Sequence, residues 1–157
     1  MIERNGWSLL FHRCFLDQTQ KLHAAAQRAH KRGDSGNANI KLFERLSRLV
    51  LETIPSDPGA AEYRLGNTLG DEHRHWQRAK IGRRFRLFFR YDTTSGVIIY
   101  AWVNDRDTQR KAGSRTDPYE VFRKMLDRGN PPETWDELLK ASESNWRGIP
   151  TKDRPEK

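Results

Sequence analysis

Apolar side chains recur every three or four positions over residues 16–31 and again over residues 38–53. That spacing places them on one face of a helix, so the pattern predicts two amphipathic helices. The segment between them, residues 33–37, is polar and contains two glycines, which is typical of a loop. Pro55 ends the second helix. We therefore expect an N-terminal helical hairpin.

The period of the pattern falls to two in the middle of the chain. Residues 76–81 and 85–91 alternate between two faces, and residues 97–103 are apolar throughout, as in a strand covered on both sides. The five-residue loop 92–96 joins the last two strands, so we expect them to pair antiparallel. Residues 7–11 also alternate and predict a short N-terminal strand or turn.

Capping residues predict two helices near the carboxyl end. Asp117 and Pro118 are an N-cap and a first helical position, and Gly129 is placed to end that helix. Thr134, followed three residues later by Glu137, forms a capping box that begins a second, short helix.

The length of the chain, 157 residues, fits one domain. We place that domain at residues 1–145, because residues 146–157 are polar and proline-interrupted and predict a flexible tail. The longest apolar run has seven residues, a membrane helix needs about 20, and no signal peptide is visible. A single cysteine excludes internal disulfides and Cys-rich zinc sites. We therefore expect a cytoplasmic protein that contacts no membrane.

Positive charge is the feature that points to a partner. The chain carries 29 lysines and arginines against 21 acids, a formal net charge of +8, and 20 of the cations are arginine. Arginine presents a planar fork of donors that fits phosphate groups and stacks on bases. The composition therefore favours a polyanionic partner, although it carries no information on the fold.

Seven of these cations lie within residues 74–90, and no acidic residue interrupts them. They are Arg74, Arg78, Lys80, Arg83, Arg84, Arg86 and Arg90. Alternation puts Arg78 and Lys80 on one face of their strand, together with Trp76. In the next strand it gathers Arg84, Arg86 and Arg90. If the strands pair, several cations crowd one patch, which costs free energy unless an anion binds there.

Two interpretations of this patch remain open. In the first, single-stranded RNA binds it, because phosphates need cations and the interleaved Trp76 and Phe88 suit base stacking. In the second, the cations are an ordinary solvated sheet face with counterions from acids such as Asp71 and Asp92. The two aromatic rings also have an alternative role as core residues.

The patch contains groups that RNA cleavage requires. RNA carries its own nucleophile, the 2′-hydroxyl, so cleavage needs a base, cations for the charge on phosphorus and an acid for the leaving oxygen, but no metal. Like charges nearby lower the pKa of a lysine, and Lys80 is the lysine inside the cluster, so we predict it as a candidate base. His73 and His75 have a spacing compatible with metal binding, but no acidic ligand pattern accompanies them, and a phosphate contact or a surface role fits better.

Motifs from about Asn5 to Leu139 resemble those of one known family. They are Asn5-Gly6-Trp7, Tyr63 to Gly70, His75 to Lys80, Phe85 to Tyr91, Ala101 to Asp105, Thr116-Asp117 with Tyr119, Val121-Phe122 with Lys124 to Leu126, and Gly129 to Pro132 with Trp135. The match is to the YhaV-type toxins, which belong to the RelE-like ribonuclease superfamily of type II toxin–antitoxin systems. The run from Phe85 to Asp105 is the specific part of the resemblance.

The resemblance implies an α+β fold of the RelE-like kind, in which an N-terminal helix pair and C-terminal helices pack on a small twisted antiparallel sheet. It implies an endoribonuclease that needs no metal or cofactor, cleaves messenger or ribosomal RNA and inhibits translation and growth. It leaves open whether the ribosome is a partner. It also implies a cognate PrlF-type antitoxin with a swapped-hairpin, AbrB/MazE-like domain, so that the pair binds operator DNA and represses its own operon.

The site residues implied by the resemblance follow the order of the strands. In RelE-like enzymes, two basic residues two positions apart on one strand precede an arginine that follows an aromatic on the next. Arg78 and Lys80 match the pair, and Arg86 matches the arginine. A further basic residue follows the last strand, where Arg106 fits by offset and Arg110 fits the YhaV-type pattern. The residues predicted as catalytic are Arg78, Lys80, Arg86 and Arg110, and those predicted to bind RNA are Arg74, His75, Arg83, Arg84, Arg90 and Arg106.

Ala112 departs from the family pattern, which usually has a tyrosine two residues after the arginine that Arg110 matches. Either the chain lacks that hydroxyl, or Tyr119 or Tyr100 supplies it. The alternative function is therefore a catalytically weak or silent nucleic-acid-binding partner of an antitoxin that acts in operon autorepression. Induced expression separates the two, because a nuclease toxin should stop growth and a silent binder should not.

Overall fold

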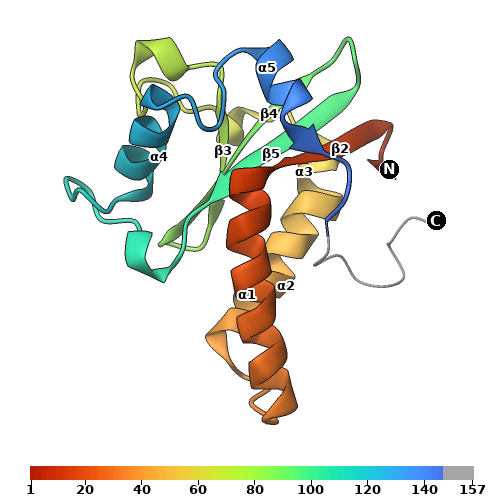
Figure 1. Cartoon of the computed structure of the whole chain (residues 1–157), viewed down its shortest axis with the longest axis vertical. Coiled ribbons are helices and arrows are strands. Elements are labelled where there is room, and N and C mark those ends of the chain that lie inside the picture. Colours follow the sequence, from red (N-terminus) through yellow and green to blue (C-terminus); the bar gives the residue numbers. More distant parts are fainter. Residues whose placement is uncertain (147–157) are drawn as a thin grey trace.

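A six-stranded sheet lies at the centre of residues 1–146, the part of the chain that the computed structural model describes (Figure 1). Its strands are β1 (Ile2–Arg4), β2 (Trp7–His12), β3 (Gln77–Ile81), β4 (Phe85–Asp92), β5 (Val97–Val103) and β6 (Ser142–Glu143). Their order is β1-β2-β5-β4-β3, and β6 pairs with β2. β5 therefore pairs with β2 at one edge and with β4 at the other.

The pairing is antiparallel with one exception. In β3-β4-β5, Lys80 lies opposite Arg86 and Tyr91 lies opposite Ile98, which confirms the predicted antiparallel segment. β2 and β5, in contrast, run parallel, with Leu9 opposite Ile98. A parallel pair needs a long connection, and the helices after β2 supply much of it. The α+β class is confirmed, with a mostly antiparallel sheet.

The helices flank this sheet. They are α1 (Arg13–Lys31), α2 (Ala38–Arg48), α3 (Ile54–Ser56), α4 (Pro118–Asp127) and α5 (Trp135–Lys140), with a wide turn at Leu49–Thr53 and 3-10 turns at Ala61–Tyr63, Asp71–His73 and Arg106–Thr108. None of the helices within residues 1–146 is long and apolar enough to cross a membrane.

α1 and α2 form the predicted hairpin, which projects beyond the sheet (Figure 1). α1 begins earlier than predicted because His12 caps it, with Nδ1 accepting a hydrogen bond from the Cys14 amide at 3.1 Å. The second helix continues beyond its predicted end. In its wide turn the Ile54 amide bonds the Leu49 carbonyl, and Pro55 lies in the last helical turn.

β5 separates two apolar clusters. Ile98, Tyr100 and Val103 contribute to the cluster that includes residues of α1 and α2. Ile99 and Trp102 contribute to the other, together with residues of α4 and α5. The strand can place Ala101 and Trp102 on the same side because the register shifts opposite Phe88 and Phe89, leaving Ala101 as a bulge.

The C-terminal region confirms the predicted caps and corrects the predicted tail. Asp117 caps α4 and Thr134 caps α5. Trp146, which the sequence placed at the start of the tail, is a core residue instead. It is 2% exposed and donates a hydrogen bond from Nε1 to Thr19 Oγ1 at 3.0 Å. The rest of the predicted tail, residues 147–157, lies outside the described residues.

Candidate active site

One face of the β3-β4 pair carries the basic residues that the sequence analysis singled out. Ala79 and Ile81 of β3 point into the core on the α1 side, so Arg78 and Lys80 face the opposite side. Lys80 lies directly across from Arg86, and side chains so paired have Cβ atoms about 4.5–5.5 Å apart. The predicted gathering of cations on one face is therefore present.

Tyr119 connects this face to α4. Its hydroxyl accepts one hydrogen bond from Arg78 Nη1 at 3.0 Å and another from Arg86 Nε at 3.1 Å. Arg110 stacks on its ring, with the guanidinium carbon 4.9 Å from the ring centre. Three of the four predicted catalytic residues, which are far apart in sequence, thus meet on one side chain that begins α4.

Neutral acceptors hold the first two arginines in place. Arg86, only 7% exposed, donates from Nη1 to the Phe85 carbonyl at 2.8 Å and to the Gly82 carbonyl at 3.3 Å. Arg78 donates from Nη2 to the Glu62 carbonyl at 3.0 Å. Carbonyl oxygens orient a guanidinium without cancelling its charge.

Three members of this group have no carboxylate partner in the described part of the chain. No carboxylate among residues 1–146 lies within ion-pair distance of Arg78, Lys80 or Arg86. The interpretation in which each cation has its own acidic counterion therefore does not hold for these three. A site with one buried and one half-buried guanidinium group, both oriented and unneutralised, favours the binding of an anion.

Arg110 is the member that does have a carboxylate. Its Nη1 bonds Asp117 Oδ1 at 2.6 Å. Asp117 also accepts from the Lys111 amide at 2.7 Å and, through Oδ2, from the Tyr119 amide at 3.1 Å. One buried aspartate therefore caps α4, holds the chain after Arg110 and places the Arg110 guanidinium over the Tyr119 ring.

The position of the tyrosine hydroxyl answers the question raised by Ala112. Tyr100 is excluded, because it is fully buried in the other cluster, where its hydroxyl donates to the Val50 carbonyl at 2.8 Å and burial raises its pKa well above the usual value. Tyr119 is at the site. The sequence clue to it was the Asp117-Pro118 cap, which puts Tyr119 in the first turn of a helix.

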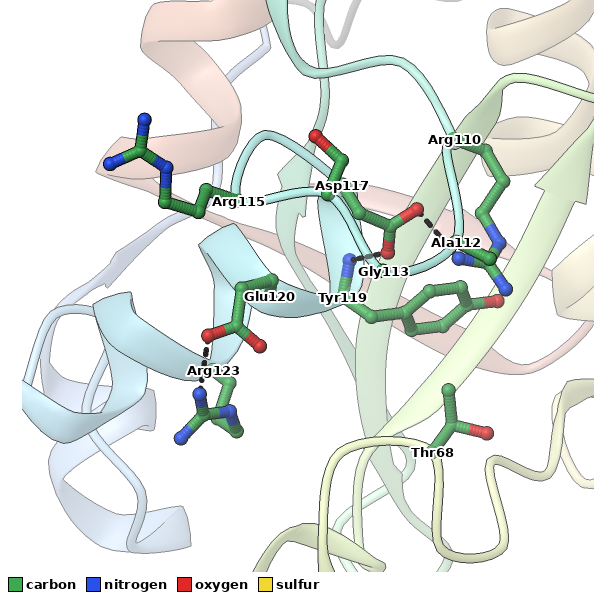
Figure 2. Close-up of a pocket in the computed structure, with 10 residues that line it drawn as sticks. Thr68, Arg110, Ala112, Gly113, Arg115, Asp117, Tyr119, Glu120 and Arg123 are labelled. Atoms are coloured by element: carbon green, nitrogen blue, oxygen red, sulfur yellow. Dashed lines mark hydrogen bonds and ion pairs between the residues drawn. The ribbon is translucent and has the colours of Figure 1, made fainter.

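A hollow of about 490 Å³ adjoins this group. Figure 2 shows the Tyr119 ring and Arg110 at one side of it and the Glu120–Arg123 ion pair at another. Ala112 and the exposed Arg115, from the loop before α4, also line it. The hollow is large enough for a nucleotide and begins where the cations converge.

Comparisons with known proteins agree with this geometry. A family model described as a toxin with endonuclease activity, of toxin-antitoxin system, matches residues 9–143. This chain belongs to the YhaV toxin family. Toxin YhaV of Escherichia coli O6:H1 is 40% identical over 147 residues, covering 90% of this chain and 95% of that protein. Ribonuclease toxin YhaV of Escherichia coli K12 is 39% identical over 145 residues, covering 88% and 94%. No solved structure matches.

Membership of the YhaV family confirms the predicted class of protein. The family consists of toxins with endonuclease activity, so the chain is an endonuclease. A toxin of a toxin–antitoxin system has an antitoxin as its partner.

Four of the residues predicted to bind RNA lie on exposed loops and turns. They are Arg74, Arg83, Arg84 and Arg106. Arg83 and Arg84 follow Gly82, whose φ of +62° allows the tight turn between β3 and β4. Arg84 donates to Gln109 at 3.2 Å, and its carbonyl accepts the Arg110 amide at 2.9 Å. The β3–β4 turn is thereby joined to the segment that carries Arg110.

The other two, His75 and Arg90, have partners away from Tyr119. Arg90 lies between Trp76 and Trp135, 5.6 Å and 5.5 Å from the ring centres, and donates to the Glu133 carbonyl at 2.7 Å. His75 Nε2 contacts Glu133 Oε2 at 2.8 Å. Burial lowers the pKa of both side chains. Their contacts fasten the segment before α5 to the sheet.

His73 is part of the same contact set. It is buried, and its Nδ1 forms an ion pair with Glu133 Oε1. Within residues 1–146, no group of three or more His, Cys, Asp and Glu side chains has a geometry that could hold a metal ion. His73 and His75 both contact the carboxylate of Glu133.

Proposed function

We propose that this chain is the ribonuclease toxin of a toxin–antitoxin pair, and that RNA is cleaved at the group formed by Arg78, Lys80, Arg86, Arg110 and Tyr119. The observation that carries the proposal is the convergence of Arg78 and Arg86 on one phenolic oxygen, with no carboxylate of residues 1–146 to neutralise them. The name of the relative from Escherichia coli K12, a ribonuclease toxin, supports RNA as the substrate.

Arg78 and Arg86 hold the scissile phosphate in this proposal. Their carbonyl partners fix both guanidiniums before substrate arrives, so little reorganisation accompanies the reaction. Attack on phosphorus adds negative charge to its oxygens, and preorganised cations stabilise that charge more than they stabilise the ground state. Because cations occupy the site, they supply the charge that a divalent metal supplies in other nucleases, and no cofactor is needed.

Lys80 and Tyr119 carry out the two proton transfers. Lys80 takes the proton of the 2′-hydroxyl as that oxygen attacks phosphorus. The Tyr119 hydroxyl already accepts two guanidinium hydrogen bonds, which leaves its own proton to be donated to the leaving 5′-oxygen. The P–O5′ bond breaks, and the products are a 2′,3′-cyclic phosphate and a 5′-hydroxyl.

The surroundings of the group favour a single-stranded substrate. The hollow beside Tyr119 accommodates a nucleotide that flanks the scissile bond, and the stacked Arg110 forms part of its wall. Arg74, Arg83, Arg84 and Arg106 are exposed, and we assign them contacts with phosphates further along the strand. His75 and Arg90 have a weaker claim to such contacts because Glu133 already binds them.

The silent-binder alternative loses its main support in this geometry. It depended on Ala112 in place of a tyrosine. Tyr119 lines the same hollow as Ala112, and its hydroxyl lies against Arg78 and Arg86. We assign the antitoxin to the PrlF type, and the complex of the two proteins to the operator DNA of their own operon. Messenger RNA, free or on the ribosome, is the proposed target, so the cytoplasm is the proposed place of action.

Incubation of the purified chain with RNA in the presence of a chelator tests the function. We expect cleavage that leaves 2′,3′-cyclic phosphate ends. The Lys80→Ala and Arg86→Lys variants should lose most of the activity, whereas Lys140→Ala, an exposed lysine on α5, should keep it. Absence of cleavage by the unmodified chain, with and without ribosomes, would contradict the function. Full activity in both site variants would contradict the site.

A further inference from the structure

The tip of the α1-α2 hairpin concentrates positive charge away from the proposed active site. Residues 21–41 contain five lysines and arginines and one acid, Asp34, a net charge of +4 out of +8 for the whole chain. The five cations are Lys21, Arg28, Lys31, Arg32 and Lys41. Half of the net charge therefore lies on a short segment that the catalytic proposal does not use.

These cations are exposed and, in the described part of the chain, have no acidic partners. All five side chains lie on the surface of the hairpin. Within residues 1–146, none of them is within ion-pair distance of a carboxylate, whereas Arg13, Arg110 and Arg123 elsewhere each have one. The single acid of the segment, Asp34, instead accepts a hydrogen bond from Asn37 at 3.0 Å. Among the residues that the structure describes, no carboxylate therefore relieves the repulsion among the five.

The hairpin presents this charge on a rigid arm. α1 has 19 residues, which corresponds to a length of about 28 Å. Buried Ala26 and Ala29 are small residues at which a second helix can approach closely, and Asn37 caps α2 through the Asn39 amide at 2.8 Å. Figure 1 shows the arm extending past the sheet, with its tip far from α4. An object bound at the tip therefore need not touch the Tyr119 site.

The side chains at the tip indicate how a nucleic acid would be recognised. Residues 24–42 contain no Phe, Tyr or Trp. Single strands are bound through stacking of bases on aromatic rings, which this segment cannot provide. Lysine and arginine without such rings contact phosphates, and double-stranded RNA is recognised mainly through its backbone and shape.

We infer that the tip of this arm is a docking surface for the phosphate backbone of double-stranded RNA, distinct from the site that cleaves single-stranded RNA. The choice of RNA over DNA rests on the proposed function, because a ribonuclease gains from an anchor on a structured region of its own substrate. The arm binds the duplex, and the Tyr119 group reaches an unpaired segment beside it.

Two charge-neutralised variants test this. One is the arm variant Arg28→Gln, Lys31→Gln, Arg32→Gln, and the other is a matched control, Arg48→Gln, Arg128→Gln, Lys140→Gln, which removes the same charge elsewhere. Glutamine is a good helix former, so both should fold, and circular dichroism checks this. Binding of a 20-base-pair RNA duplex is measured by fluorescence anisotropy in chelator over a series of salt concentrations.

The arm variant should bind the duplex at least tenfold more weakly than the unmodified chain near 0.1 M salt. Its plot of log affinity against log salt should be shallower by about two to three, since each of up to three lost phosphate contacts removes nearly one. The control should change by less than threefold, and cleavage of a short single-stranded RNA should be equal in all three. A DNA duplex of the same sequence should bind more weakly than RNA.

Several results would overturn the inference. These are unchanged duplex binding by the arm variant, an equal loss in the control, loss of single-strand cleavage together with duplex binding, or equally tight binding of the DNA duplex. Duplex binding that depends on the arm, in a chain that cleaves nothing, would refute the proposed function and leave the arm assignment standing. Cleavage without duplex binding that depends on the arm would refute the arm assignment and leave the proposed function standing.

Discussion

At the scale of single residues, Tyr119 has the most contacts that bear on chemistry. It joins two guanidiniums through its hydroxyl and a third through its ring, so the two parts of one side chain have separable roles. Two of these contacts come from strands and one from a loop. The three arginines therefore meet at Tyr119 only in the tertiary structure, whereas the place of Tyr119 at the start of a helix is visible in the sequence.

Replacement of Tyr119 by phenylalanine separates those roles. The ring and its stacking with Arg110 remain, but the hydroxyl is lost, so we expect turnover to fall by about 10²–10⁴-fold, the usual contribution of a general acid. Tyr100→Phe is the matched control, because it removes a buried hydroxyl that bonds Val50. It should cost about 1 kcal/mol of stability and leave cleavage intact. Rates that fall equally in both would assign Tyr119 a structural role only.

His12 gives the stability of the fold a dependence on pH. Its Nδ1 accepts a hydrogen bond and so carries no proton, and burial, followed by the neighbouring Arg13, lowers its pKa below 6.5. The unfolded chain therefore binds the proton more readily than the folded chain. The stability is complete above pH 6.5 and is lost as the pH falls from there toward the folded pKa.

The variant His12→Asn should reduce this pH dependence. Asparagine caps a helix without titrating, so urea unfolding between pH 8 and pH 5 should show a smaller loss of stability than in the unmodified chain. His30→Asn, at an exposed position of the same helix, should leave the original loss unchanged. His75, whose pKa is also lowered, keeps part of the dependence in both variants.

At the scale of elements, the sequence predicts those that depend on residues close together along the chain. These are the helix caps, the two helices of the hairpin and the strands β3, β4 and β5. Asp117 and Thr134 are examples, since a cap is recognised from the four residues that follow it. The wide turn before Pro55 was not predictable, because it leaves the apolar spacing around Val50 almost unchanged. β1 is three residues long, too short for an alternating pattern.

The two capped helices provide a prediction about activity. Asp117→Ala and Thr134→Ala each remove an N-cap, which costs about 1 kcal/mol. Asp117 also holds Arg110 and begins the helix that carries Tyr119, so its variant should lose most of the cleavage activity as well. The Thr134 variant should be destabilised by a similar amount and remain active at 25 °C. Comparable activity in the two variants would mean that Asp117 caps its helix but does not support the active site.

At the scale of the whole molecule, long-range pairing decides what sequence patterns cannot. The parallel pairing of Leu9 with Ile98 and the meeting of Arg78 with Tyr119 join segments that are 89 and 41 residues apart. No local pattern encodes such contacts. The face that carries the proposed catalytic cations was predictable from alternation, but the absence of carboxylates near Arg78 and Arg86 within residues 1–146 required the tertiary structure.

Trp146 shows how the end of the described chain contributes to the fold as a whole. Its ring packs against Phe11 at 5.6 Å and Phe15 at 5.4 Å between ring centres, in the cluster on the α1 side of the sheet. Trp146→Ala should therefore lower the free energy of unfolding by about 3–5 kcal/mol. The Tyr119 group lies on the opposite side of the sheet, so the folded variant should cleave RNA at the normal rate at low temperature. A urea titration and a cleavage assay at 15 °C measure the two effects. A loss of activity in variant protein shown to be folded would mean that the two clusters are coupled through β5.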